Sequence, residues 1–537
     1  MKLFAWFMLI IIGTVSLTLW PAALRAAEVK KGVNRMQGRP FVFNQDCENM
    51  LGYAPEGNVV ARCREWLQRV FAAGVGVFVA DVAGPVIFVK DIPSGEVIGA
   101  RSPANSWRYK KIQEMSAQGT DLLHLATEEG HKAGALVLGG MRMSDAHHGD
   151  KWQAQSDNLL FPKVVMDHPE WCNTWEDGSL DATLNYAIPE VQAYQLAILR
   201  EMATNYDIDG LELDWMRWCR HFPHGHQREY LDVLTDFVRQ VREMLDEVAQ
   251  QRGCERFVLG HRVAATVDEC LNIGCDVETW AREGYADFLA PMDFLQVDPN
   301  LRTEEFVAAT EGTKCLVYPS VQDRYVYDAA YAPRLDSLDK FRAVAHNFYS
   351  WGADGGSSFN VYLWGPEQQQ FYTEAIAILA SGELATAGPR HYVYVPTWKG
   401  HGGGVAPTGR HNAQMLTFGA NTVGQRQPFT FRMADGRYGE ALEGMLRFRI
   451  FDATPEDEFA VDLNGEAIAS DKFQIEYQPE GEQTSEPFRW PAGLCFEIPL
   501  ADCPPFRGDN ELGITLLKKD PAAQTDPVME VLEVYVE

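Results

Sequence analysis

The chain has 537 residues, of which 46% are hydrophobic and 23% charged, a composition that excludes a disordered chain and a multi-span membrane protein. This length exceeds one ordinary domain, so we expect a barrel-sized unit with a second part attached. Asp and Glu number 75 against 47 Lys and Arg, and the formal net charge of -28 repels phosphate groups, so we expect no nucleic acid partner.

The N-terminal segment has the pattern of a signal peptide. Lys2 is followed by an apolar run from Leu3 to Trp20 and then by small residues up to Ala27. We therefore predict a signal peptide over residues 1–26 and an exported protein, periplasmic or secreted, with no stable membrane span after cleavage. An uncleaved membrane anchor is the alternative, because the apolar run approaches the roughly 18 residues of a spanning helix.

Residues 38–382 alternate short apolar runs with longer helical patterns, as a parallel sheet covered by helices requires. The predicted strands are Phe41–Asn44, Gly76–Asp81, Ala135–Met141, Ile208–Asp214, Phe257–His261, Phe288–Met292, Cys315–Pro319 and Ser357–Leu363. Helical patterns between them include Asn58–Ala73, Pro189–Tyr206, Gln227–Gln251, Leu338–Trp351 and Glu367–Ala380. Eight such units predict an α/β fold, a (β/α)8 TIM barrel, with a doubly wound open sheet as the alternative.

The C-terminal part has a different pattern. A Gly/Pro-rich stretch predicts a linker over residues 383–413. Short alternating segments separated by turns then predict an all-β sandwich, an accessory domain over residues 414–537 that resembles the jelly-roll modules attached to such barrels. Asn464-Gly465 is a strong signal for a hairpin turn.

The fourth predicted strand carries the most informative polar residues. Strand periodicity places Gly210, Glu212 and Asp214 on one face, and Leu211, Leu213 and Trp215 on the face that meets the helices. The two carboxylates therefore point into the barrel, where an unpaired charge is costly. The alternative to a catalytic role is a pair of structural salt bridges, from Glu212 to Arg142 or Arg262 and from Asp214 to Arg217.

This region resembles a known family. Asn185-Tyr186, Pro189-Glu190-Val191 and the stretch from Tyr206 to Asp214 are similar to motifs of the bacterial family-10-like glycosyl hydrolase group. The resemblance is strongest over residues 185–217 and implies a glycosidase-type barrel. Two related barrel types match less well: Met216 stands where family 18 has its acid, and Glu212 stands where the amylase type has Arg.

Glycoside hydrolysis usually needs two carboxyl groups on opposite sides of the bond, and neighbours on one strand are poorly placed for this. We therefore predict Asp214 as nucleophile or base and look to other strand ends for its partner. Asp293, which directly follows the sixth strand between Met292 and Phe294, is preferred, and Glu269 is the reserve. Asp268 and Asp323 are further candidates, and a helix cap or a loop ion pair is the structural alternative for Asp293.

Other strand ends carry polar and aromatic groups suited to sugars. The predicted substrate-binding residues are Arg217, Trp215, Asp46, Asp81, Arg142, His147, Arg262, Tyr362 and Trp364. Asn44, Asp145 and Asn360 are further strand-end groups suited to sugar hydroxyls, and Trp218 is a further candidate for stacking. The Arg residues at the mouth of an otherwise acidic protein favour an anionic sugar, a uronate or sulfated unit.

Metal and cofactor chemistry is not indicated. The ten cysteines lack zinc-site spacing, and the His147-His148 pair lacks a third spaced ligand, so we predict no metal and no organic cofactor. Two close cysteine pairs, Cys270 with Cys275 and Cys495 with Cys503, are disulfide candidates, with buried free thiols as the alternative.

Together these features predict an exported glycoside hydrolase acting on a polysaccharide or oligosaccharide through paired carboxylates. Two other functions fit the same scaffold. One is a catalytically silent glycan-binding protein, because Met216 replaces the family 18 acid, and the other is a polysaccharide lyase.

Overall fold

The structure is a computed structural model that describes residues 34–84, 86–146, 162–175, 177–293, 297–323, 335–361, 368–395, 415–436, 442–482 and 489–537. The predicted signal peptide lies outside these residues. Within the described ranges, none of the helices combines the length and apolar character needed to cross a membrane.

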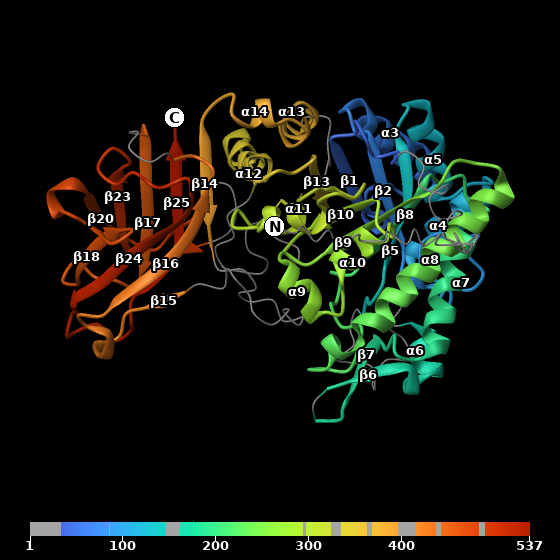
Figure 1. Ribbon diagram of the computed structural model, residues 1–537, viewed down its shortest axis with the longest axis horizontal. Helices are drawn as coiled ribbons and strands as arrows, with labels where there is room; N and C mark the ends of the chain where they lie inside the picture. Colours follow the sequence, from blue (N-terminus) through green and yellow to red (C-terminus); the bar gives the residue numbers. More distant parts are fainter. Residues whose placement is uncertain are drawn as a thin grey trace, which may run out of the picture. The chain divides into compact units, whose positions relative to one another are not determined.

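A parallel sheet forms the first part of the chain (Figure 1). Its strands are β1 (Phe41–Asp46), β2 (Val77–Ala83), β5 (Leu136–Arg142), β8 (Gly210–Asp214), β9 (Val258–Val263), β10 (Phe288–Pro291), β11 (Leu316–Val317), β12 (Ser320–Val321) and β13 (Gly356–Phe359). They pair in the order β11-β10-β9-β8-β5-β2-β1-β13-β12. Each of the eight predicted strands overlaps one of these.

The two ends of this order are adjacent in the chain. Only Tyr318 and Pro319 separate β11 from β12, and Pro319 has no N–H for the ladder. β11 pairs with β10 and β12 pairs with β13, so the ladder passes through eight strand positions and returns to its start. This is the order of a (β/α) barrel rather than of a doubly wound open sheet.

Helices cover the outside of the parallel strands; α3, α5, α7 and α8 are labelled there in Figure 1. The helices are α2 (Cys47–Tyr53), α3 (Val59–Ala72), α4 (Trp107–Ala117), α5 (Leu122–Lys132), α6 (Lys163–Asp167), α7 (Pro189–Asn205), α8 (Leu231–Arg252), α9 (Val267–Asn272), α10 (Val277–Arg282), α11 (Thr303–Thr310), α12 (Leu338–Ser350), α13 (Gln369–Leu379) and α14 (Gly382–Ala385). Four short strands, β3 (Val86–Ile87), β4 (Glu96–Val97), β6 (Cys172–Thr174) and β7 (Leu180–Leu184), lie in connections. Outward-facing strand residues such as Phe43, Phe78 and Leu211 share one core cluster with these helices.

Side chains inside the barrel form two layers. The layer toward the amino ends of the strands is apolar, with Val42, Val77, Leu136, Val258 and Phe288 in one buried cluster. Two or more residues further along the same strands, the inward side chains become polar and charged. Strand periodicity alone produces this stacking, because every second residue of a strand faces inward. A charged layer thus lies at the carboxyl end of the barrel, where such folds place their sites.

The C-terminal part contains two main antiparallel sheets around their own core. One has the strands β14 (Arg390–Tyr394), β15 (Leu416–Thr417), β17 (Gly444–Phe451), β20 (Gln474–Gln478), β23 (Gly493–Pro499) and β25 (Val528–Val536). The other has β16 (Arg426–Met433), β18 (Glu458–Leu463), β19 (Glu466–Ile468) and β24 (Gly508–Lys518), and a small hairpin joins β21 (Gly481–Glu482) to β22 (Arg489–Trp490). The all-β character agrees with the prediction, while the jelly-roll topology and the extent of a separate domain stay predictions.

The predicted hairpin turn and linker have different outcomes. Asn464 and Gly465 have φ of 54° and 84° and connect β18 to β19, as predicted. The predicted linker 383–413 contains β14, which pairs with β25, so the antiparallel sheet begins before residue 414. The signal for this strand is the alternation Arg390-His391-Tyr392-Val393-Tyr394, in which Tyr392 and Tyr394 are fully buried.

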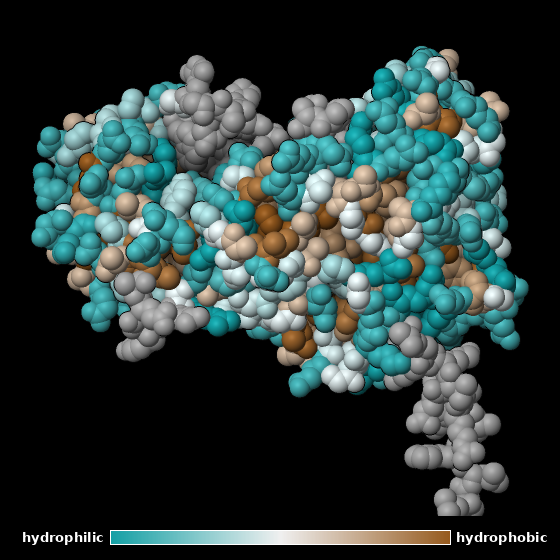
Figure 2. Space-filling model, turned by 90° about the horizontal axis from the view of Figure 1, so that it is seen from above, coloured by the Kyte–Doolittle hydropathy of each residue, from teal (hydrophilic) through white to brown (hydrophobic). Residues whose placement is uncertain are grey.

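The ten cysteines all lie in the described ranges, and all are free thiols. The two predicted candidate pairs are therefore not bonded here, and nine of the ten thiols are buried. On the face shown in Figure 2, hydrophilic residues cover most of the periphery, and hydrophobic residues gather in patches between them. This surface agrees with the acidic, globular composition.

Candidate active site

Asp214 lies at the centre of the charged layer, at the end of β8. The register pairs it with Arg142 of β5 on one side and Arg262 of β9 on the other. Arg262 Nη1 donates a hydrogen bond of 2.6 Å to Asp214 Oδ1, which also accepts from the backbone N–H groups of Met216 (2.8 Å) and Arg217 (3.1 Å). Three donors on one oxygen fix the orientation of the carboxylate.

The second oxygen of Asp214 is different. Asp214 is 2% exposed, and among the described residues its Oδ2 has no hydrogen-bond partner. A buried carboxylate oxygen without a partner loses hydration that nothing replaces, which is unfavourable. This oxygen is enclosed by its surroundings, so a water molecule or a substrate reaches it only when neighbouring groups move.

Glu212 is the preceding inward-facing residue of the same strand, two positions before Asp214. Asn44 Nδ2, from β1, donates a short hydrogen bond to its Oε1. Its register neighbours on both sides are glycines, Gly140 and Gly260, and a Cβ at Gly260 would meet the Phe288 ring at 2.0 Å. Burial, with the nearby Asp214 charge, raises the pKa of Glu212 to about 8, so its neutral form dominates at pH 7.

Arg142 is surrounded by three carboxylates. Its guanidinium lies 2.6 Å from Asp46 Oδ2, 2.7 Å from Asp81 Oδ2 and 3.3 Å from Asp145 Oδ2. Although burial opposes its charge, these carboxylates raise the pKa of Arg142. Burial also raises the pKa of Asp81 to about 7, while the nearby Arg142 opposes this rise. Arg142 is thus fully engaged by side chains of the protein itself.

Two non-glycine residues at this end of the barrel have left-handed backbone conformations. Trp218, after β8, has φ of 59°, and Asn360, after β13, has φ of 54°. Asn360 Oδ1 accepts a hydrogen bond of 2.8 Å from the N–H of Asp46, and Trp218 Nε1 donates one of 2.8 Å to Asp145. Such conformations cost about 1–3 kcal/mol each and collect at functional sites.

The two predicted partner carboxylates are both buried. Asp293 follows β10 and is 1% exposed, and Glu269, in the first turn of α9, is 2% exposed. Met292, the residue before Asp293, places its sulfur 3.5 Å from Arg262 Nη2, the guanidinium that binds Asp214. Asp293 is therefore one residue from the charged layer, and Glu269 is set back on a helix.

The predicted binding residues divide into three groups. Asp46, Asp81, Arg142 and Arg262 join the charged layer, and Arg217, half-buried, lies at its edge with its guanidinium carbon 5.8 Å from the Trp218 ring centroid. Trp215 is a poor choice for stacking, because it is fully buried and packs against Tyr186, Phe237 and Trp280 on the helix side of β8. His147, Tyr362 and Trp364 lie outside the described residues.

The structural salt-bridge alternative was partly right: a buried Arg–carboxylate pair is present, but Arg262 binds Asp214 instead of Glu212. The further strand-end groups Asn44, Asp145 and Asn360, and the aromatic Trp218, all contact residues of the charged layer. The sequence did not indicate their partners, which come from other strands and loops.

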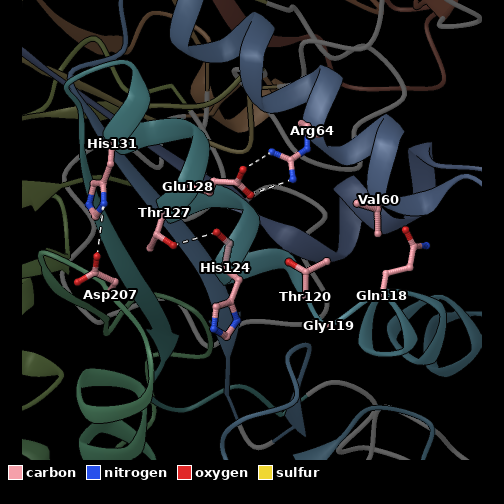
Figure 3. Close-up of a pocket in the computed structure, with 10 residues that line it drawn as sticks. All are labelled: Val60, Arg64, Gln118, Gly119, Thr120, His124, Thr127, Glu128, His131 and Asp207. Atoms are coloured by element: carbon pink, nitrogen blue, oxygen red, sulfur yellow. Dashed lines mark hydrogen bonds and ion pairs between the residues drawn. The ribbon is translucent and has the colours of Figure 1, made fainter.

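A cavity of about 640 Å³ lies outside the barrel, and Figure 3 shows the ten residues that line it. They come from α3, α5, the turn between α4 and α5, and Asp207 ahead of β8. Its charged groups are already paired, as in the 2.8 Å contact between Arg64 and Glu128. None of the ten comes from the carboxyl end of a parallel strand, so the cavity is separate from the charged layer.

Within the described ranges, Asp91, Asp121 and His124 form one group whose ligand atoms are close enough for a metal ion. Asp121 caps α5, and its oxygens already accept hydrogen bonds from the His124 N–H (2.9 Å) and the Tyr206 hydroxyl (2.7 Å). A helix cap explains this group, and we assign no metal to it.

Removal of Arg262 is expected to destabilise the protein. Arg262 is 1% exposed, and the Arg262→Met variant leaves the buried Asp214 charge without its main partner, at a cost of about 3–5 kcal/mol. Urea-induced unfolding at pH 7 measures the change. The Arg262→Met/Asp214→Asn double variant should be less destabilised than the sum of the single variants, and strict additivity would contradict the pairing.

The strand order and the charged layer define a (β/α) barrel with ionisable groups at the carboxyl ends of its strands. Residues 79–224, which include β5, β8 and Asp214, match the family described as Glycosyl hydrolase-like 10. The resemblance predicted from residues 185–217 is thereby confirmed. No curated protein matches the chain.

Three solved structures illustrate the similarity in fold. The glycoside hydrolase domain of PgaB (BpsB) from Bordetella bronchiseptica is 11% identical, with a TM-score of 0.38, over 63% of this chain and 98% of that one. The maltogenic α-amylase AmyB from Thermotoga neapolitana is 12% identical, with a TM-score of 0.37, over 76% and 91%. A family 18 N-acetylglucosaminidase from Paenibacillus barengoltzii is 12% identical, with a TM-score of 0.37, over 64% and 99%.

Proposed function

We propose that the protein is an exported glycoside hydrolase that cleaves a polysaccharide or oligosaccharide at the carboxyl end of its barrel. The observation that carries this proposal is the Asp214 carboxylate, fixed through one oxygen and, among the described residues, without a hydrogen-bond partner at the other. Asp214 acts as nucleophile or base on the anomeric carbon or its water. Export rests on the sequence pattern of residues 1–26 alone.

Glu212 supports this role because it is neutral at pH 7. Two ionised carboxylates on neighbouring inward positions would repel each other, so the protonated Glu212 leaves Asp214 with the negative charge. Asp293 is our choice for the acid that protonates the leaving oxygen, because it comes from a different strand and lies beside Met292, which contacts Arg262. Glu269 is the reserve.

The anionic-sugar hypothesis is tested at Arg217, which is half-buried at the edge of the charged layer. Arg142 and Arg262 bind carboxylates of the protein, so substitution of either would disturb the layer itself. The Arg217→Ala variant should lose about 10-fold or more in kcat/KM on a uronate or sulfated glycan and little on a neutral one. An equal loss on both kinds of glycan would remove the hypothesis.

The test of the function is a screen of the purified protein against neutral, uronate and sulfated polysaccharides. Release of reducing ends without a rise in ultraviolet absorbance supports hydrolysis. Products that absorb in the ultraviolet would indicate a lyase instead. Glycan binding without any product would indicate the silent binding protein.

A further inference from the structure

We propose that Trp175, at the end of the β6 strand, forms a second sugar-binding subsite for an oligosaccharide chain that extends out of the barrel mouth. This inference rests on the proposed function, because it assigns a longer substrate to the same site. Trp175 is 37% exposed, although most of the large hydrophobic side chains described are buried. The β6–β7 hairpin that carries it is labelled beside α6 in Figure 1.

The Trp175 ring has a firm support on one side. It stacks on the His224 ring with centroids 4.0 Å apart and planes 18° apart, and the Arg220 guanidinium carbon lies 5.1 Å from its centroid. His224 and Arg220 both contact the same oxygen, Asp181 Oδ2, at 3.3 Å and 2.5 Å. Groups on opposite faces of an indole would be too far apart to share one oxygen, so His224 and Arg220 lie on one side of the ring, and 37% of Trp175 remains exposed.

The support itself is buried. Asp181 is 3% exposed and Arg220 6% exposed, and Arg220 Nη2 donates a second hydrogen bond of 2.9 Å to Asp181 Oδ1. A two-bond Arg–carboxylate pair has a fixed geometry, so the Trp175 ring is held in place before any ligand arrives. A rigid aromatic side chain that stays 37% exposed suits contact with the apolar C–H face of a pyranose ring.

A continuous series of contacts connects this platform to the charged layer. The Arg220 guanidinium carbon also lies 5.4 Å from the Trp218 ring centroid. Trp218 donates its 2.8 Å hydrogen bond to Asp145, and Asp145 binds Arg142, the register neighbour of Asp214. These contacts connect the Trp175 platform to the residues around Asp214, so we place the second subsite beside the β5 and β8 ends of the barrel.

The test measures binding as a function of chain length. In an Asp214→Asn background, which prevents turnover, calorimetry compares di- and hexasaccharides of cello-, xylo- and chito-oligosaccharides. We expect a hexasaccharide to bind more tightly than its disaccharide, and Trp175→Ala to weaken hexasaccharide binding by about 10-fold while leaving the disaccharide unchanged. Trp175→Phe should restore most of the loss. Tyr477→Ala, which removes an aromatic side chain 46% exposed on β20, is the matched control and should have no effect.

Equal binding of hexasaccharides to the Trp175→Ala and control variants would overturn the subsite, as would a failure of every hexasaccharide to bind. The hydrolase proposal fails separately. If the wild type releases no reducing ends but Trp175→Ala still weakens hexasaccharide binding, the subsite stands and the catalytic role falls. Thermal unfolding of both variants verifies that the fold is intact.

Discussion

The Asp214→Asn variant is expected to lose hydrolysis, with kcat reduced by about 10³-fold or more. Asn keeps an oxygen that accepts from Arg262 and from the backbone N–H groups of Met216 and Arg217. An amide nitrogen takes the place of Oδ2, so Asn can neither form a covalent intermediate nor remove a proton from water. The loss should appear in kcat rather than in the affinity for an unreacted oligosaccharide.

The matched control is Asp236→Asn. Asp236 is a half-exposed carboxylate on α8 that pairs with Arg239 on the outside of the barrel. This variant should retain wild-type kcat, because its side chain is remote from the charged layer. Both variants are assayed below the onset of their measured unfolding transitions, with circular dichroism as the measure of fold. Activity of Asp214→Asn within 10-fold of wild type would remove Asp214 from the mechanism.

The Glu212→Gln variant is expected to resist alkaline destabilisation. The pKa of Glu212 is about 8 in the folded protein, above its ordinary value of 4.5, because the side chain is buried beside Asp214. Between these pH values the folded state binds more protons than the unfolded state, so the free energy of unfolding of the wild type falls as pH rises from 4.5 to 8. Gln is always neutral, so this loss, on the order of 5 kcal/mol, is absent from the variant.

Urea denaturation at pH 5, 7 and 9 measures this difference. Asp81, with a pKa of about 7, adds to the same trend in both proteins, so the Gln variant should keep part of the pH dependence. The comparison of slopes isolates Glu212. Parallel slopes for wild type and variant would show that Glu212 is ionised at pH 7 and would contradict its assignment as a neutral neighbour of Asp214.

The strands of the barrel could be predicted because each is an apolar run between longer helical patterns. The inward direction of Glu212 and Asp214 followed from periodicity alone, since their neighbours Leu211 and Leu213 are apolar. The charge partners could not be predicted in this way. Arg262 faces Asp214 rather than Glu212 because of the register between β8 and β9, and register depends on tertiary pairing.

Aromatic residues show a second limit. Trp215 was selected for stacking because it is aromatic and follows a strand end. Strand periodicity had already placed it on the face that meets the helices, and it is buried there. Trp175 has no motif around it, and only the fold brings His224, Arg220 and Asp181 together beneath its ring. Residues whose neighbours are distant in sequence leave no local pattern, so single-sequence reasoning passes over them.

The Asp214 oxygen that lacks a partner also makes it possible to identify the substrate by binding alone, without an activity assay. A hydroxyl group that donates to Oδ2 supplies the missing hydrogen bond only in the folded protein, so a sugar that fits should raise the unfolding temperature. A ligand at about 100 times its Kd adds about 2.7 kcal/mol to the free energy of unfolding. A library of glycans can therefore be ranked by the rise in unfolding temperature that each one produces, without detection of any product.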